Sequence, residues 1–366
     1  MKRRSFLTLT AGLAALGAVS TSAWVWHKGK KQPLLLSARD DRQGNHYVVA
    51  YHLDGSKRFE TQVAERCHDV ISHPHDSVAL YVGRRPSTES YLVDLQTGQV
   101  LQTLRTPKQR HFQGHAIIHK EGQLAYTTEN DTSDPGRGVL GVWQWQERQF
   151  VRVKELSTHG IGVHQLLWMP DGESIVIANG GIRTEADSRE MLNLNNMEPS
   201  LVLMKRSGEL ISKEFLADQM NSIRHLAIAK DGTIIAVQQY EGDKRDKVPL
   251  VAIKRPSQPF VPFPITEEQR SVMNQYAASV AIHSDLRLVA MSAPRGNRFF
   301  IWDLDSGETR LNAKMLDCAG IAATEKGFVA TSGVGRCRTY DCTQAKPQMR
   351  VLELPAGLWD NHANFA

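Results

Sequence analysis

Residues 164–181 read HQLLWMPDGESIVIANGG, and residues 200–216 read SLVLMKRSGELISKEFL. In the first stretch a Pro-Asp-Gly turn separates two apolar runs, and in the second a Ser-Gly turn does the same. Asp-Gly and Ser-Gly between alternating apolar runs are typical of β-hairpins. The two stretches therefore predict four consecutive antiparallel strands joined by tight turns.

This four-strand plan recurs along the chain. Residues 34–56 make a partial copy, and further copies begin at His68, His115, His225, Ser279 and Ala319. A period of about 40–50 residues with four strands in each unit is typical of a β-propeller, and no long helical periodicity competes with it. We therefore predict an all-β fold, a seven-bladed β-propeller with four-stranded blades, as a single domain over residues 34–366.

The same pattern places the remaining segments of the ring. We expect the strand MRVLELP, residues 349–355, to pair with strands from the N-terminal end and close the propeller. Long insertions at residues 181–199 and 241–247 fall in turns between strands.

The first 23 residues, MKRRSFLTLTAGLAALGAVSTSA, resemble an export signal. RRSFL at residues 3–7 fits the twin-arginine pattern, and the apolar stretch that follows is short and weak for a transmembrane helix. Sec export and an uncleaved anchor are the alternatives. We expect residues 1–23 to be a twin-arginine-type signal peptide, the mature protein to be periplasmic, and no stable membrane span to remain after signal removal.

The charge balance argues against nucleic-acid binding. The net charge is +5, and removal of Lys2, Arg3 and Arg4 with the signal leaves +2, spread over scattered residues. We expect no nucleic-acid partner and a monomer. Cys337 and Cys342 lie five residues apart around an expected turn and are candidates for a disulfide bond in an exported protein.

One histidine stands at the same place in four successive repeats, where it opens an apolar run that ends in a turn. The four are His68, His115, His164 and His225, at intervals of 47, 49 and 61 residues. In a closed ring these imidazoles, from the second to the fifth blades, converge at one mouth of the central channel. Convergent imidazoles predict a site for one transition-metal ion. A structural histidine in each blade would give the same pattern.

Polar residues at the ends of the second strands are expected beside these histidines. The seventh residue after the turn glycine is Glu129, Asn179 or Gln239 in three successive blades. Such side chains orient metal ligands, and Glu129 is also a candidate ligand or proton carrier. Further candidates for the same mouth are His159, Glu198, Arg224 and Cys318.

Two of these further candidates have specific alternative roles. Arg224 would bind an anion, or pair with Glu129 or Glu198. Cys318 stands at the histidine position of the last repeat and would be either a ligand or a small buried core residue.

Several stretches, in order, carry a resemblance to a known family. They are GHAIIHKEGQLAYTTEND at 114–131, THGIGVHQLLWMPDG at 158–172, IVIANGGIRT at 175–184, LNLNNMEPSL at 192–201, SIRHLA at 222–227, the Gln-Tyr at 239–240 and WDNH at 359–362. The chain resembles the exported bacterial propeller family catalogued as domain of unknown function 1513. Val163 stands where the family pattern has proline before the histidine, which alters the local turn rather than the ligand.

The resemblance implies a periplasmic role linked to iron or another transition metal. Genes of the family tend to sit beside imelysin-like proteins and a di-haem oxidoreductase-like protein, which makes these the expected partners. The resemblance favours iron or copper as the bound metal, with zinc as an alternative. It supplies no established activity.

Three functional hypotheses remain open. The first is a periplasmic metal-binding propeller in iron, or copper-linked iron, acquisition. The second is a metal-dependent periplasmic enzyme, an oxidoreductase that uses an open metal position. The third is a metal-free scaffold for protein interactions. The sequence carries no specific substrate signal that would decide whether the protein is an enzyme.

Overall fold

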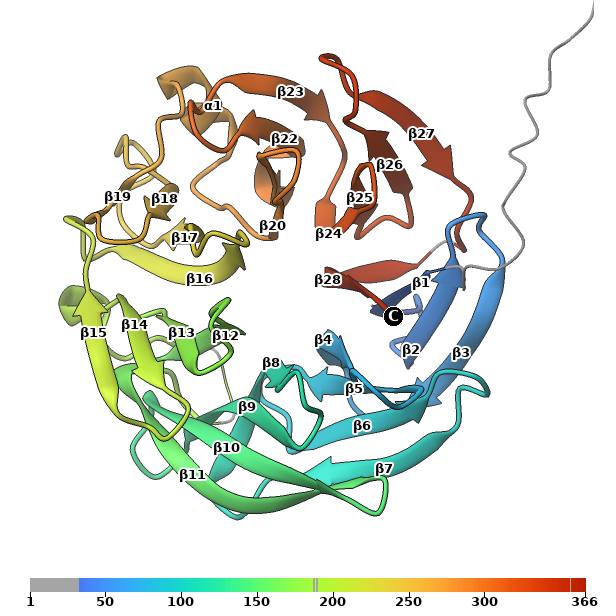
Figure 1. The fold of residues 1–366 in the computed structure, drawn as a ribbon. Coiled ribbons are helices and arrows are strands. Elements are labelled where there is room, and N and C mark those ends of the chain that lie inside the picture. The colour runs from blue at the N-terminus through green and yellow to red at the C-terminus, as the bar shows by residue number, and fades with distance from the viewer. Residues whose placement is uncertain (1–32, 187, 189, 356) are drawn as a thin grey trace, which may run out of the picture. The chain divides into compact units, whose positions relative to one another are not determined.

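Seven four-stranded antiparallel sheets stand around a common axis in the computed structural model, which describes residues 33–366 except 187, 189 and 356 (Figure 1). The predicted seven-bladed β-propeller is confirmed for these residues. The expected signal peptide at residues 1–23 lies outside the described residues. No helix in the described ranges is both long and apolar enough to cross a membrane.

The strands of each blade are given in order from the axis outward. The first blade contains β28 (Leu358–Phe365), β1 (Leu34–Asp40), β2 (His46–His52) and β3 (Lys57–Val63). The second to fourth contain β4 (Cys67–Ser72), β5 (Val78–Gly83), β6 (Glu89–Asp94) and β7 (Val100–Arg105); β8 (Arg110–Ile118), β9 (Leu124–Asp131), β10 (Arg137–Gln146) and β11 (Gln149–Ile161); and β12 (Val163–Trp168), β13 (Ser174–Asn179), β14 (Ser200–Lys205) and β15 (Leu210–Glu214).

The fifth to seventh blades contain β16 (Asn221–Ile228), β17 (Ile234–Tyr240), β18 (Val251–Lys254) and β19 (Phe260–Pro262); β20 (Val280–His283), β21 (Leu288–Ala293), β22 (Arg298–Asp303) and β23 (Thr309–Lys314); and β24 (Cys318–Thr324), β25 (Gly327–Ser332), β26 (Cys337–Asp341) and β27 (Gln348–Leu352). Helix α1 (Glu267–Val272) and the 3₁₀ turns η1 (Leu194–Asn196) and η2 (Pro294–Gly296) lie in connections between strands.

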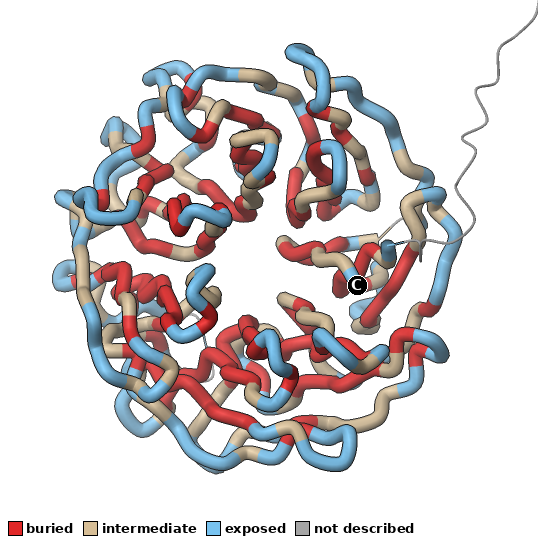
Figure 2. Tube along the Cα trace, viewed as in Figure 1, coloured by how far each residue is buried: buried red, intermediate tan, exposed pale blue. Residues whose placement is uncertain are grey.

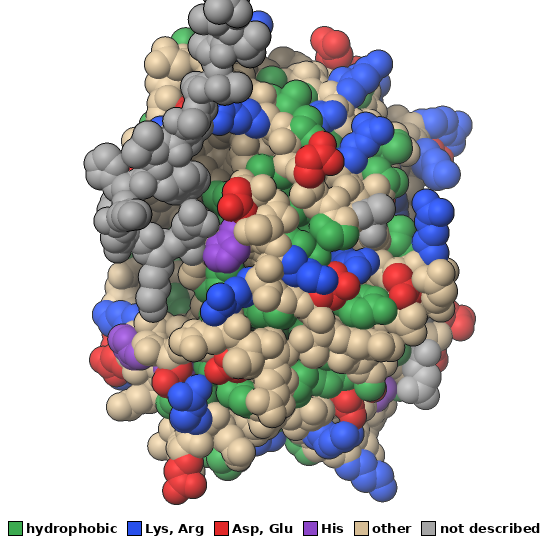
Figure 3. Space-filling view, turned by 90° about the vertical axis from the view of Figure 1, so that its right-hand side faces the viewer, with side chains coloured by type: hydrophobic (Ala, Val, Ile, Leu, Met, Phe, Trp, Pro, Cys, Tyr) green, Lys and Arg blue, Asp and Glu red, His purple; other side chains and the backbone are tan. Residues whose placement is uncertain are grey.

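The hydrophobic core lies between neighbouring blades. Strands β5 and β13 are buried on both faces, so they read as continuous apolar runs, VALYVG and SIVIAN. One large cluster joins the fifth and sixth blades around Trp302, whose ring stacks on Phe300 with centroids 4.9 Å apart. Burial falls toward the outer strands (Figure 2), where acidic and basic side chains are interspersed (Figure 3).

The strand that closes the ring is β28. It pairs with β1, with Ser37 opposite Ala363, and forms the innermost strand of the first blade. The prediction that MRVLELP closes the ring is wrong, because β27 pairs with β26 and is the solvent-facing outer strand of the seventh blade. The exposed residues of β27 suit an edge strand, whereas β28 beside the axis buries half of its residues.

The expected bond between Cys337 and Cys342 is not formed. All four cysteines of the chain are buried and unbonded. Cys337 packs between the seventh and first blades, whereas Cys342 packs between the sixth and seventh. The two side chains therefore lie on opposite faces of the same blade.

A set of turn histidines links neighbouring blades. His73 donates from Nε2 to the Gly122 carbonyl of the next blade at 3.0 Å, and its Nδ1 accepts from the Asp76 amide at 3.0 Å. His119 and His283 make the equivalent bond to the next blade, at 3.0 and 3.2 Å. Because one ring nitrogen donates and the other accepts, this link requires a neutral imidazole.

Candidate metal centre

Imidazoles from the innermost strands of five blades meet near the axis. They are His68 of β4, His115 of β8, His164 of β12, His225 of β16 and His362 of β28. Among the described residues, one ligand atom from each of four of them, all but His164, lies within 4.8 Å of the others. His164 stands at the edge, with its Nε2 3.0 Å from Nε2 of His225. The site is a buried four-histidine cluster with a fifth imidazole beside it.

The structure therefore brings together three of the four predicted histidines and adds His362. Nε2 of His362 is 2.9 Å from Nε2 of His225. His164 contacts His225 and lines the adjoining cavity, but it lies outside the tight group.

A break in strand register accompanies the histidines. In the third blade Phe112 pairs with Glu129 and Ala116 pairs with Thr127, so four steps along β8 match two along β9. The register also shifts near the histidines of β4, β12 and β16. A β-bulge breaks the alternation of side chains and re-aims one of them. Thr128 Oγ1 accepts from the backbone N–H of His115 at 3.3 Å, which satisfies a group that the bulge removes from the ladder.

Two carboxylates fix the orientation of the imidazoles. Nδ1 of His68 lies 2.5 Å from Oδ1 of Asp360, and Nδ1 of His115 lies 2.9 Å from Oδ2 of Asp69. A proton on Nδ1 that is donated to a carboxylate leaves the Nε2 lone pair free. Carboxylates hold metal-ligating histidines in the same way.

Burial lowers the pKa of four of the five imidazoles and so disfavours their charged forms. It lowers the pKa of His68 to about 4, although Asp360 opposes the shift. Burial, reinforced by neighbouring imidazoles, also lowers the pKa of His164 and His225 well below 6.5, and burial has the same effect on His362. Neutral imidazole is the form that binds metal ions.

The cluster cannot satisfy its own nitrogens. Nε2 of His225 lies within 3.0 Å of the Nε2 atoms of both His164 and His362, yet it offers only one lone pair or one proton. Nε2 of His115 is buried without a hydrogen-bond partner. Buried polar atoms are normally paired, so this arrangement calls for a group at the centre that the side chains themselves do not supply.

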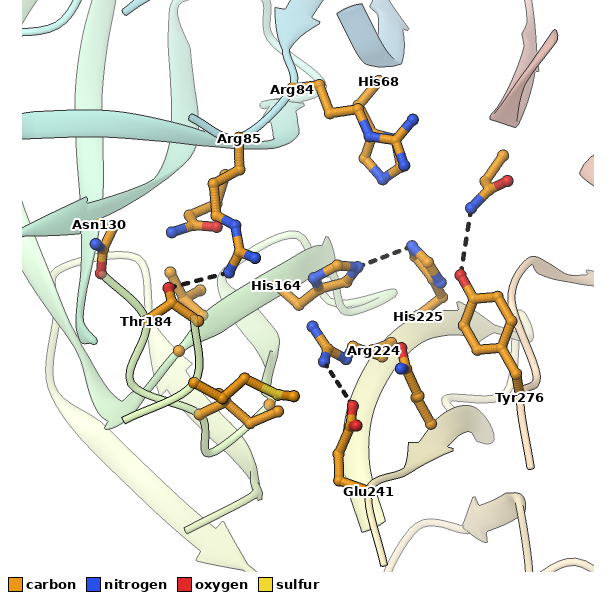
Figure 4. Close-up of a pocket in the computed structure, with 18 residues that line it drawn as sticks. His68, Arg84, Arg85, Asn130, His164, Thr184, Arg224, His225, Glu241 and Tyr276 are labelled. Carbon is orange, nitrogen blue, oxygen red and sulfur yellow. Dashed lines mark hydrogen bonds and ion pairs between the residues drawn. The ribbon is translucent and has the colours of Figure 1, made fainter. Parts of the chain in front are cut away.

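A cavity of about 250 Å³ adjoins the cluster. His68, His164 and His225 form part of its wall (Figure 4). The predicted candidates Gln239 and Arg224 also line it. Arg224 pairs with Glu241 at 3.4 Å, whereas a pair with Glu129 or Glu198 was one of the two alternatives that the sequence offered, the other being an anion.

The other predicted neighbours lie elsewhere. Glu129 is buried against Arg152 of β11, with 2.6 Å between Oε1 and Nη1, and so faces the outer part of its blade. Asn179 donates to the Thr158 carbonyl at 3.3 Å. At the ends of β9 and β13, the residues that line the cavity are Asn130 and Gly180, one position further on. A one-residue shift moves a strand side chain to the opposite face, which explains why Glu129 and Asn179 do not line the cavity.

Three remaining candidates are also outside the cluster. His159 is on the outermost strand β11 and contacts the Gly208 carbonyl through Nε2 at 2.9 Å. Glu198 is exposed in the insertion before β14. Cys318 packs in the core between the sixth and seventh blades, which is the alternative that the sequence analysis gave for it.

Sequence reasoning missed His362, Asp69 and Asp360. His362 is followed by the short stretch Ala-Asn-Phe-Ala, without the longer apolar run and hairpin turn that mark the other repeats. Asp69 directly follows His68, and Asp360 stands two residues before His362 in WDNH. A carboxylate next to a repeated histidine is a signal that points to Asp69, whereas Asp360 is two residues from a histidine that the repeat pattern does not mark.

The fold is similar to that of a chain of hydrazine synthase from Kuenenia stuttgartiensis, with a TM-score of 0.62. The two are 12% identical, and the match covers 91% of this chain and 99% of that chain, so the likeness concerns the fold alone. No curated protein matches the chain. Residues 61–366, which include the second to seventh blades in full, match the family described as protein of unknown function (DUF1513). The chain belongs to that family.

Proposed function

We propose that this protein is a periplasmic metal-binding propeller that holds one transition-metal ion in the histidine cluster. The observation that carries the proposal is the set of imidazoles at the axis whose Nε2 atoms lack enough hydrogen-bond partners. A cation at their centre would satisfy these lone pairs together. The paired carboxylates at Nδ1 support the same assignment.

The spacing of the nitrogens fits a metal ion. With nitrogen-to-metal distances of about 2.0–2.1 Å, two imidazoles at a right angle around one ion are about 3 Å apart. Nε2 of His225 is 3.0 Å from that of His164 and 2.9 Å from that of His362. An all-imidazole set suits iron, copper, zinc or nickel. The resemblance in the sequence favours iron or copper, and a role in metal acquisition with imelysin-like or di-haem oxidoreductase-like partners.

The first test is elemental analysis of the mature protein, purified through its own export route without chelator. We expect about one equivalent of a transition metal. His115→Ala and His225→Ala should each lose it, because both residues belong to the four-histidine group. His159→Ala is the matched control, since it removes an imidazole that lies on an outer strand.

Two outcomes would reject the proposal. One is a metal-free wild-type protein that stays empty after incubation with iron, copper, zinc and nickel. The other is a metal content that His115→Ala and His225→Ala leave unchanged. Either result would favour the interaction scaffold.

A further inference from the structure

One side of the histidine cluster opens on the cavity. His68 and His225 belong to the four-histidine group and also line the cavity, whereas His115 and His362 are not part of its wall. An ion in the group would therefore be accessible from the cavity side. A water molecule takes up about 30 Å³ of liquid, so a cavity of about 250 Å³ has room for a small ligand beside the ion.

The cluster itself supplies no anionic ligand. Among the described residues, the group of converging ligand atoms consists of imidazole nitrogens and contains no carboxylate or thiolate. Two carboxylates contact the group, but Asp360 accepts from His68 and Arg84, and Asp69 accepts from His115. A buried cation is unfavourable unless an opposite charge pairs with it. An ion held there would therefore favour an additional, anionic ligand on its accessible side.

Arg224 brings an unpaired donor to the cavity wall. Its Nε is buried without a hydrogen-bond partner among the described residues, and its Nη2 makes only a long contact of 3.4 Å with Oε1 of Glu241. Buried N–H groups are normally paired. A guanidinium fork matches two oxygens of one planar oxyanion. Since Arg224 directly precedes His225 on β16, this fork and a histidine of the cluster come from the same strand.

Tyr276 brings a second donor, which a strained turn holds in place. Its Oη accepts from Nδ2 of Asn361 at 3.4 Å, and no described residue accepts the phenol proton. Asn274 and Gln275, directly before it, have φ of +52° and +55°. Residues other than glycine rarely adopt this conformation, and the Tyr240 amide fixes it by donating to the Gln275 carbonyl at 3.1 Å. Strain that the surroundings impose in this way is common at ligand sites.

We propose that the cavity binds a small planar oxyanion of the carbonate type as a co-ligand of the metal ion, with Arg224 and Tyr276 donating to it. Figure 4 shows both side chains in the wall together with His225. The anion supplies the negative charge that the cluster lacks, and its oxygens accept from the guanidinium and phenol groups. The inference rests on the proposed function, because the anion is held between the ion and these two donors.

The test is a competition titration of Cu(II) between the full exported chain and a copper chelator, in carbonate-free buffer and in the same buffer with bicarbonate. We expect bicarbonate to tighten Cu(II) binding about tenfold to a hundredfold, since the anion adds charge-assisted hydrogen bonds. It should also change the electron paramagnetic resonance spectrum of the bound copper. Arg224→Gln and Tyr276→Phe should each remove most of the gain, and Arg224→Lys, which keeps the charge without the fork, should retain more of it than Arg224→Gln.

The matched control is Tyr240→Phe, which removes a phenol hydroxyl that binds Asp246 outside the cavity and should leave the bicarbonate gain unchanged. Glu241→Gln removes the carboxylate that competes for Arg224 and should increase the gain. The inference is overturned if chloride at equal ionic strength gives the same gain, or if Tyr240→Phe loses as much of it as Tyr276→Phe. Copper binding with the same affinity and spectrum in both buffers would mean that only water occupies the position, and would reject this inference alone. A chain that binds no copper in either buffer would reject the metal centre as well.

Discussion

A single methyl group added at Gly114 should dismantle the histidine cluster. Gly114 precedes His115 and has φ +101°, and a Cβ there would lie 2.7 Å from Cδ2 of His68. The His68 ring cannot easily retreat. Its Nδ1 is held 2.5 Å from Asp360, and its centroid is 4.6 Å from that of His362. Gly114→Ala therefore forces either the backbone or the His68 imidazole to move.

The expected loss of unfolding free energy has two parts, and a control variant separates them. An alanine in the positive-φ region costs about 1–2 kcal/mol of unfolding free energy. The clash with a packed ring adds about 1–3 kcal/mol. Gly44→Ala is the matched control, because Gly44 has φ +85° and a Cβ there would meet nothing within 4 Å. We expect Gly44→Ala to cost only the first part.

The assay is urea unfolding with and without metal. At a free metal concentration one hundred times Kd, binding adds about 2.7 kcal/mol to the unfolding free energy. Wild type and Gly44→Ala should both gain this amount. If displacement of His68 weakens affinity about a hundredfold, Gly114→Ala should gain only about 0.4 kcal/mol under the same conditions. A full metal-dependent gain in Gly114→Ala would refute the placement of His68 in the site.

Other perturbations address the edge of the cluster, its carboxylate and the turn histidines. His362→Ala should abolish metal retention, whereas His164→Ala should only weaken affinity, because His164 lies outside the four-histidine group; metal titrations rank the two variants. Asp360→Asn leaves two guanidinium groups and an imidazole without their shared carboxylate, so the unfolding free energy from urea titration should fall by about 3–5 kcal/mol. Burial lowers the pKa of His73, so the unfolded chain takes up a proton at a higher pH than the folded one. The stabilisation by neutral His73 is therefore present above about pH 6.5 and is lost as the pH falls below that value. The difference in stability between wild type and His73→Gln should shrink from pH 8 to pH 5, and a difference that stays constant would contradict this account.

The repeat pattern predicted the blades because each hairpin is a local feature. The turn signals and apolar runs of each blade lie within one unit of about 45 residues, so each hairpin can be predicted without knowing how the ring closes. The closing strand is different. Ser37 and His362 contact each other although they are 325 positions apart in the sequence. Neither segment carries a local signal that predicts this pairing.

The site was predictable to the extent that its residues repeat. His68, His115 and His225 recur at one position of the unit, whereas His362 belongs to a strand with no hairpin partner after it in sequence. The second ring of polar residues failed for another reason. Strands β9 and β13 keep an unbroken register with β10 and β14, so the count from the turn glycine simply ends one residue short of the positions that line the cavity, Asn130 and Gly180.

The closing strand β28 gives the cluster a dependence on the whole chain. Asp360 and His362 come from the last strand, and they meet His68, which lies nearly 300 residues earlier, only when the seam between β28 and β1 has formed. A nascent or C-terminally truncated chain therefore lacks two groups of the site, however well its other blades have folded. An ion bound by these residues would link β28 to the neighbouring blades across the seam. Metal binding would then require that the ring has closed.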